Sequence, residues 1–423
     1  MADSSRPVMA LPRGPGGGRR PQGAYAAVAV AGAGRAAPGL RGVRPTGARA
    51  TAAAAPAPRR APPNEGVVLL LGLVALLTVI GLVMVLSASS DEAMLQGSSP
   101  WVYFERQLLW VALGAVSLVT FATLDYRRWR HVGLPLLVAV IGLLVAVCVP
   151  GVGIVVSGSR RWLGAGPWQF QPSELAKLAV ILFTADLLTR RADRMHDTRF
   201  TFRPVAIVLA VMSALIMKQP DMGTTVIVVG VAAAILWVAG SPPRTLFNAG
   251  AVFGAFAGLL GVLAPYRLHR LLSFLHPERD KTNTGYQAVQ ARVGMATGRL
   301  FGVGLGAGRE KTGYLPNAHT DFIFAVIGEE VGLVGCLVVV LLFVGFVFLG
   351  VRAAARAPDR FGTLVATGIT AWVVLQALVN VGAVVGLLPV TGVPLPFVSF
   401  GGSSTVIAMA GVGILANIAK QGR

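Results

Sequence analysis

Ten blocks of mainly apolar residues, most of them about 20 residues long, dominate the sequence from residue 66 onward. About 20 apolar residues in a helix cross the roughly 30 Å hydrocarbon core of a bilayer, and lipid admits only helices or closed barrels. The sequence lacks the alternating ten-residue strands that a membrane barrel needs. We therefore predict an all-α polytopic membrane protein with ten transmembrane helices. The predicted spans are 66–88, 104–123, 132–150, 173–190, 204–218, 223–240, 245–264, 321–351, 362–386 and 401–419.

The composition excludes an ordinary soluble fold. Hydrophobic residues make up 54% of the 423 positions and charged residues only 13%, about half of the roughly 25% usual in soluble domains. The two cysteines, Cys148 and Cys336, lie in apolar blocks without metal-ligand spacing. Buried free thiols are the expected outcome.

The positive charge is best explained by membrane topology. A net charge of +19 would suggest a nucleic-acid partner in a soluble protein, but ten arginines lie in residues 1–60 and most others flank spans. Basic clusters follow the second, fourth and eighth spans, so the positive-inside rule makes both termini cytoplasmic and the large loop 265–320, between helices 7 and 8, extracytoplasmic. Residues 1–65 are expected to form a disordered basic cytoplasmic tail before the membrane domain 66–423. The tail has no compact signal-peptide pattern, so the first span would direct targeting.

Two charged groups stand where lipid should not tolerate them. Glu174 and Lys177, three residues apart after Pro172, share one helical face. They are either an ion pair that only neutralises itself or the polar wall of a cavity, because intramembrane charges usually mark functional sites. Arg160, beside Arg161 and Trp162, lies on the predicted outer side, either as an interfacial anchor or as a contact to an anionic ligand.

Asp321 lies where the large loop enters the eighth span. A carboxylate is favoured at a helix N-terminus, so capping by Asp321, Thr320 or Asn317 is one interpretation. A functional site is the other, because further polar residues crowd the same stretch. These are Arg309, Lys311, His319, Glu329 and Glu330.

The helical wheel separates the two glutamates of the eighth span. Glu329 lies about 12 Å deeper than Asp321 and roughly 80° around the helix, whereas Glu330 points nearly opposite. We expect Glu329 to be the neighbour of the cavity.

Two stretches predict irregular backbone. Alternating glycines at 302–308 fit no nucleotide-binding pattern and indicate a flexible or closely approached loop near a bulky substrate. The uncharged stretch from Pro389 to Ser404 contains three prolines and predicts a re-entrant or interfacial segment that lines a chamber for a lipid headgroup. Pro220-Asp221-Met222-Gly223-Thr224 is interpreted first as a cap for the sixth span.

Four separated motifs, in order along residues 66–420, resemble the shape, elongation, division and sporulation (SEDS) family. Leu86-Ser87-Ala88-Ser89-Ser90 and the long tail look most like its cell-division branch, with the elongation branch the close alternative. The chain has Ser157-Gly158-Ser159 where the family usually has Asn-Gly-Ala, and Phe400 where tyrosine is commoner. The motifs are Gln171-Pro172-Ser173-Glu174 with Lys177, Gln219-Pro220-Asp221-Met222-Gly223-Thr224, Tyr314-Leu315-Pro316 with His319-Thr320-Asp321-Phe322, and Pro389 to Ser404.

This resemblance implies a peptidoglycan glycosyltransferase that polymerises lipid II into glycan strands at the outer face of the bacterial cytoplasmic membrane, at the division septum. A class B penicillin-binding protein and other division proteins would be its partners, with membrane lipids around it and no nucleic acid. The resemblance carries the family's essential aspartate to Asp321 and its cavity glutamate and lysine to Glu174 and Lys177.

The chemistry expected of such a site is attack of a sugar hydroxyl on an anomeric carbon with loss of a lipid pyrophosphate. We expect Asp321 to be the general base, and Lys177, Arg160 and Lys311 to be candidates for stabilising the pyrophosphate. No cofactor is required by the sequence, and a divalent cation could share that task. The further candidate substrate-binding residues are Glu174, His319, Glu329 and Ser399.

Two other function classes remain open. A lipid flippase or transporter also uses buried charges and broken helices, although no inverted repeat is evident and the charged cluster lies at an outer mouth. A catalytically silent scaffold for division proteins is the third possibility.

Overall fold

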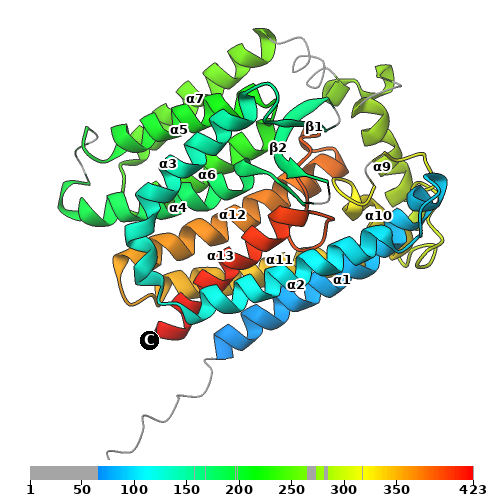
Figure 1. Ribbon diagram of the computed structural model, residues 1–423, viewed down its shortest axis with the longest axis horizontal. Coiled ribbons are helices and arrows are strands. Elements are labelled where there is room, and N and C mark those ends of the chain that lie inside the picture. The colour runs from blue at the N-terminus through cyan, green and yellow to red at the C-terminus, as the bar shows by residue number, and fades with distance from the viewer. Residues whose placement is uncertain are drawn as a thin grey trace, which may run out of the picture. The chain divides into compact units, whose positions relative to one another are not determined.

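The computed structural model describes residues 65–422, except 157, 167, 196, 198, 264–272, 281–283 and 317. Nearly all of the predicted tail 1–65 therefore lies outside the described residues. The described part is mostly helical (Figure 1). Its main helices are α1 Glu65–Leu95, α2 Val102–Thr123, α3 Trp129–Cys148, α4 Pro172–Arg190, α5 Phe202–Lys218, α6 Met222–Val238, α7 Pro243–Leu263, α9 Thr284–Gly298, α10 Ile323–Glu330, α11 Gly332–Ala355, α12 Arg360–Val385 and α13 Gly402–Gln421.

Six described helical segments are long and apolar enough to cross a membrane, as expected of a helical membrane protein. Nine of the ten predicted spans each coincide with one helix, apart from small shifts at the ends and the longer α1. Block length and apolarity therefore place most helices correctly. The six segments are α1, α2, Tyr126–Cys148, α11, α12 and α13, and α6 is apolar but shorter.

The interior of the protein is built around α12 and α13. In the most apolar 18-residue stretch of each helix, 67% is buried in α12 and 72% in α13, against 11% in α2. Helix α13 packs along α2, and α12 packs against α4, α6 and α11 (Figure 1). Because α12 packs against several other helices, polar side chains on it can link several elements.

The eighth predicted span is broken, so the prediction of one helix over 321–351 is wrong. Helix α10 ends at Glu330 and α11 begins at Gly332, whose φ of +78° suits glycine. The freed backbone groups are bonded by the glycine loop, which we define as residues 299–308. Val303 and Gly304 donate to the carbonyls of Glu329 and Glu330 at 2.9 and 3.0 Å.

The other side of the break is bonded in the same way. The amides of Leu333 and Val334 donate to the carbonyls of Arg299 and Leu300 at 2.9 and 3.1 Å. A Cβ on Gly302 would collide with the carbonyl oxygen of Glu330. The alternating glycines therefore mark a closely approached loop, as one of the two sequence interpretations had it. The predicted large loop also contains a helix of its own, α9.

A small antiparallel sheet corrects the all-α prediction. Strands β1 Ile154–Val156, β2 Ser159–Ala165 and β3 Trp168–Phe170 pair in the order β1-β2-β3. Gly158 and Gly166, with φ of +75° and +56°, make the two turns. Arg160 and Arg161 are neighbours on β2, so their side chains point to opposite faces.

Candidate active site

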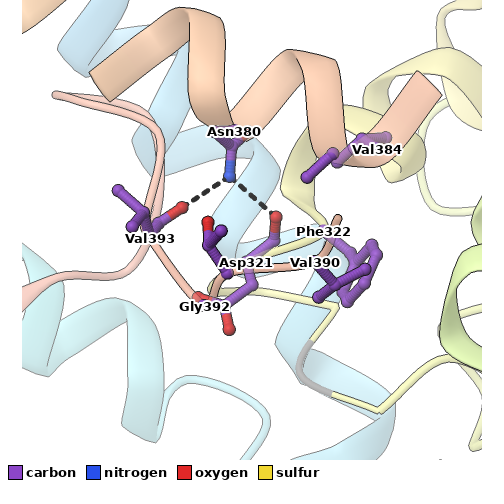
Figure 2. A pocket seen from close by; sticks show the side chains of 9 residues that line it. Asp321, Phe322, Asn380, Val384, Val390, Gly392 and Val393 are labelled. Carbon is purple, nitrogen blue, oxygen red and sulfur yellow. Dashed lines mark hydrogen bonds between the residues drawn. The ribbon is translucent and has the colours of Figure 1, made fainter. Parts of the chain in front are cut away.

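Asp321 lies in a small pocket at the entrance to α10. The pocket has a cavity volume of about 10 Å³, room for about one water molecule. Figure 2 shows Asp321 between α12 and the segment that carries Val390, Gly392 and Val393. The lining residues are Asp321, Phe322, Asn380, Ala383, Val384, Val390, Thr391, Gly392 and Val393.

Asp321 is one residue outside the helix N-cap. Phe322 is the N-cap of α10 and has no side-chain cap bond. Of the three capping candidates, Asn317 lies outside the described residues. The main chain of Asp321 is held from α12, because Asn380 Nδ2 donates to its carbonyl at 2.8 Å (Figure 2). The aspartate is thus fixed by a contact that is remote in sequence.

The proline loop, which we define as residues 389–400, forms the opposite wall. Its backbone is irregular, as predicted, and six of its twelve residues are buried while the other six are half-buried. Asn380 Nδ2 also donates to Val393 O at 2.8 Å, and Gln376 Nε2 donates to Pro394 O at 3.0 Å. Ser399 is buried, and its hydroxyl accepts from the amide of Leu395 at 2.8 Å. Its hydroxyl is used to hold the loop.

Glu174 and Lys177 form a buried ion pair that reaches beyond its own helix. Lys177 Nζ lies 2.8 Å from Glu174 Oε2, and the two side chains are 0% and 4% exposed. The same ammonium donates to Gln376 Oε1 at 2.7 Å and lies over the ring of Trp372. Gln376 and Asn380, one turn apart on α12, both donate to the proline loop. The ion pair is therefore linked to that loop through Gln376, and Asp321 is linked to it through Asn380.

The motif at residues 219–224 also packs against this loop. Asp221 caps α6, accepting from the amide and hydroxyl of Thr224 at 3.1 and 2.9 Å, which confirms the predicted cap. A Cβ on Gly223 would collide with Val393 and lie 2.9 Å from Thr391 Cβ. Glycine is required there because the loop approaches so closely.

The two arginines of β2 have different surroundings. Arg161 donates to the carbonyls of Gln219 and Pro220, so it holds the turn before α6. Arg160 is half-buried, and among the described residues its Nε has no hydrogen-bond partner. Of the two, Arg160 retains donor capacity for an anion.

A second polar centre lies where α10 ends. Lys311 Nζ is 2.8 Å from Glu330 Oε1, and the side chains are 2% and 0% exposed. Ser87 of α1 donates to both carboxylate oxygens of Glu330 at 2.8 and 2.7 Å. Glu329 is also buried and accepts from the amide of Arg309 at 2.7 Å.

The helical wheel predicted Glu330 nearly opposite Asp321, and in the structure Glu330 is buried as well as Glu329. The side of α10 opposite Glu329 is covered by α1 and by Lys311, so both glutamates are inside. Lys311, predicted as a phosphate contact, has a glutamate as its nearest charge. Wheel geometry gives only a direction and does not reveal what packs there.

His319 lies in an aromatic cluster near the C-terminal end of α1 and the N-terminal end of α2. Its Nδ1 is 3.1 Å from Glu92 Oε2, and its ring lies 4.8 Å from Tyr103 and 5.6 Å from Phe400. Its carbonyl accepts from the amide of Phe400 at 3.0 Å. His319 thus joins the segment before Asp321 to the end of the proline loop.

Several residues of the site were missed from the sequence. Gln376 and Asn380, polar and four apart inside an apolar span, carry a signal that could have revealed them, because polar groups in such spans usually have partners. Ser87, Glu92 and Thr391 carry no such signal. Within the described part of the chain, no group of three or more His, Cys, Asp or Glu residues could hold a metal ion.

Comparison with known proteins agrees with this architecture. A family described as "Cell cycle protein", comprising FtsW, RodA and SpoVE, matches residues 67–423. The "Probable peptidoglycan glycosyltransferase FtsW" of Geobacter metallireducens is 39% identical over 354 residues, which cover 84% of this chain and 94% of the relative. "Stage V sporulation protein E" of Bacillus subtilis is also 39% identical, over 84% of this chain and 97% of its own.

Solved structures show the same fold. A chain from "Structural coordination of polymerization and crosslinking by a peptidoglycan synthase complex" is 29% identical, covers 83% of this chain and 96% of its own, and gives a TM-score of 0.69. The "Rod shape determining protein RodA" of Thermus thermophilus is 28% identical, with a TM-score of 0.61 over 83% of this chain and 95% of its own.

Proposed function

This chain belongs to the FtsW, RodA and SpoVE family of cell cycle proteins, and from that premise we propose that it is a peptidoglycan glycosyltransferase that polymerises lipid II during septal cell-wall synthesis. The relatives named FtsW, at 39 to 41% identity, support the division role over an elongation role. The observation that carries the proposal is Asp321, fixed in a pocket between α12 and the proline loop.

Asp321 acts as general base. A sugar hydroxyl is a poor nucleophile until its proton is removed, and a positioned carboxylate that takes this proton is typically worth about 10²–10⁴-fold in rate. The hydroxyl oxygen forms the bond to the anomeric carbon while the bond to the lipid pyrophosphate breaks, and the electron pair leaves with the phosphate. The proton passes to Asp321.

Arg160 is the cation best suited to the departing pyrophosphate, because Lys177 and Lys311 each have a glutamate at 2.8 Å. Positive groups fixed in advance stabilise charge that develops in the transition state. Glu174 and Lys177 shape the wall on α4, and His319, Glu329, Lys311 and Ser399 hold the segments around Asp321. A divalent cation, if bound, would supply counter-charge to the pyrophosphate.

Ten helices span the membrane in this proposal, with α10 and α11 together making the eighth, and both termini are cytoplasmic. The segment between α7 and α10 then lies outside the membrane, on the same side as Asp321. The partner is a class B penicillin-binding protein that cross-links the strands, together with other division proteins at the septum. Residues 1–65 form a basic cytoplasmic tail.

The proposal is tested with the purified full chain and its transpeptidase partner, given lipid II in detergent. We expect glycan strands from the wild type and at least a 100-fold lower rate from Asp321→Asn, which keeps the shape but not the basicity. Asp186→Asn is the matched control, because Asp186 pairs with Arg130 and Arg190 and takes no part in the site. Equal rates for wild type and Asp321→Asn would refute the assignment of the base. Movement of lipid II across liposomes without polymer would identify a flippase instead.

A further inference from the structure

Two buried amide side chains on α12 hold the proline loop at neighbouring carbonyls. Asn380 Nδ2 donates to Val393 O at 2.8 Å, and Gln376 Nε2 donates to Pro394 O at 3.0 Å. The two residues are 2% and 4% exposed. Irregular backbone in the interior needs such partners, because an unpaired buried carbonyl is costly. On these two bonds alone, Asn380 and Gln376 only stabilise the loop.

Asn380 has a second task, because the same nitrogen also holds Asp321. Its Nδ2 donates to Asp321 O at 2.8 Å as well as to Val393 O (Figure 2). Two acceptors around one end of an amide identify that end as the nitrogen. The donor is thus shared between the segment that carries the proposed base and the loop that faces it. The spacing of these two backbones is therefore set by a single side chain.

The proline loop and the segment before α10 meet at two further points. The amide of Phe400, at the end of the loop, donates to His319 O at 3.0 Å. At Gly392 a Cβ would lie 3.5 Å from Asp321 Oδ2, so the loop passes close to the carboxylate itself. Asp321 and the proline loop therefore form one unit, which Asn380 and Gln376 attach to α12.

The surroundings of Gln376 fix the orientation of its amide. Its Oε1 accepts from Lys177 Nζ at 2.7 Å and from Trp372 Nε1 at 2.9 Å. Because two donors hold the oxygen, the nitrogen faces the loop. Lys177 also pairs with Glu174, so the ion pair on α4 orients the amide that holds Pro394. The buried pair thus acts on the site through Gln376.

Tertiary bonds matter for Asp321 because it precedes α10. Phe322 is the N-cap of that helix, so Asp321 lies outside its regular hydrogen-bond ladder. A general base has to lie within about 2.6–3.2 Å of the hydroxyl oxygen whose proton it takes. Misplacement by about 1 Å, caused by a change far from the chemistry, can cost about 10²-fold in rate. The contacts that set the position of Asp321 therefore bear directly on the rate.

We propose that Asn380 and Gln376 are positioning residues for Asp321. Asn380 acts directly on the main chain of Asp321, and Gln376 acts through the proline loop. The inference rests on the proposed function, in which Asp321 takes a proton from the attacking hydroxyl. The effect on polymerisation is then larger at Asn380 than at Gln376.

The main test is Asn380→Leu, which has nearly the same shape but donates no hydrogen bond. With lipid II and the transpeptidase partner, we expect kcat to fall by about 10-fold to 100-fold at an unchanged KM. The solvent deuterium isotope effect on kcat should rise, because a misplaced base slows the proton transfer. Gln376→Met should lower kcat less. Asn380→Gln, which restores the donor, should recover part of the rate.

Asn417→Leu is the matched control, because Asn417 is also a buried amide that joins two elements. Its Nδ2 donates to Ala122 O at 2.9 Å, and its Oδ1 accepts from the amide of Tyr126 at 3.0 Å. The control should lower the Tm by a comparable amount. Its kcat per folded protein, with the folded fraction measured by size-exclusion chromatography, and its isotope effect should stay at the wild-type values.

Three results would overturn the positioning role. They are a wild-type kcat in Asn380→Leu, equal losses of kcat in Asn380→Leu and Asn417→Leu, and a lower kcat with a wild-type isotope effect. The last result would mean that less of the protein is active, since an isotope effect is a ratio that does not depend on the active fraction. If Asn380→Leu does not fold, Gln376→Met is judged by the same criteria.

The positioning role and the underlying function fail in different ways. If the wild type makes no polymer under conditions in which a known lipid II polymerase does, the proposed function fails and the positioning role fails with it. If the wild type makes polymer and Asp321→Asn does not, the activity and its base stand. The Asn380 series then decides the positioning role alone.

Discussion

Two buried pairs of lysine and glutamate, alike in geometry, are built into the protein in different ways. In both pairs the Nζ to Oε distance is 2.8 Å and the side chains are almost fully buried. Lys177 and Glu174 lie one turn apart on α4, and their outside partner is Gln376 on α12. Lys311 and Glu330 are 19 residues apart and join the large loop to the end of α10, with Ser87 of α1 between them.

The two ion pairs therefore stabilise different parts of the structure. The α4 pair is preformed by its helix, so its removal affects the packing of α4 against α12 in the interior. The Lys311 pair exists only when the loop is docked, so its removal affects the docking. The first should influence global stability and the second local stability, and four variants test this distinction.

The largest effect is expected from Lys177→Met. It leaves Glu174 buried without its counter-charge, which costs about 3–5 kcal/mol of unfolding free energy. The Tm in detergent measures the loss. The double variant with Glu174→Gln should recover most of it, because no unpaired charge remains. Equal Tm values for the single and double variants would show that the charge itself is not what matters.

Lys311→Met should cost less, about 2–3 kcal/mol, since Ser87 still donates to both oxygens of Glu330. Its effect should be local. Trypsin should cut faster after the exposed Arg299 and Arg309, as seen by the masses of the fragments. Under the same conditions Lys177→Met should not show this selective cutting. If both variants gave the same fragments at the same rate, the Lys311 pair would not have the local effect that distinguishes it from the Lys177 pair.

Gly302→Ala tests the docking of the glycine loop without changing charge. Gly302 has a φ of +79°, and a Cβ there would collide with Glu330 O. Gly306 is the matched control, because its φ is +81° and the space around it is open. Both alanines carry the left-handed strain of about 1 kcal/mol. Only Gly302→Ala adds the collision, and we expect about 2 kcal/mol further loss in unfolding free energy, measured by denaturant titration. Equal losses would mean that the loop is not closely docked.

The smallest effect is expected at Glu310, which lies beside the second pair. Burial, together with the charge of Glu329, raises the pKa of Glu310 above its usual value of 4.5. A raised carboxyl pKa favours the folded state fully below pH 4.5, and this contribution is lost as pH rises through the raised pKa. Glu310→Gln should remove this part of the dependence of Tm on pH and gain less than about 1 kcal/mol at neutral pH. An unchanged pH profile would rule out Glu310 as the titrating group.

Features that depend on residues close together in the chain were predicted, whereas contacts between distant segments were not. Block length and apolarity located nine helices, and the spacing of Glu174 and Lys177 placed them together, because both signals are local. The break after Glu330 was missed because the apolar run continues through it and glycine is common in membrane helices. The sheet at 154–170 was missed because its strands are as short as three residues.

The site was predictable in its residue types more than in its contacts. Asp321, which the sequence predicted as the base, lines a small pocket in the structure, but its neighbours Asn380 and Thr391 come from segments about 60 residues away or more in the chain. The partner of Lys311 was missed for the same reason. Long-range contacts depend on packing, which no local pattern records.

The junction of α10 and α11 also constrains how the protein assembles. Before the glycine loop docks, a break after Glu330 would leave carbonyls and amides facing lipid, which offers them no partner. The glycine loop bonds the carbonyls of Glu329 and Glu330 and the amides of Leu333 and Val334. The break in the helix and the docked loop therefore depend on each other.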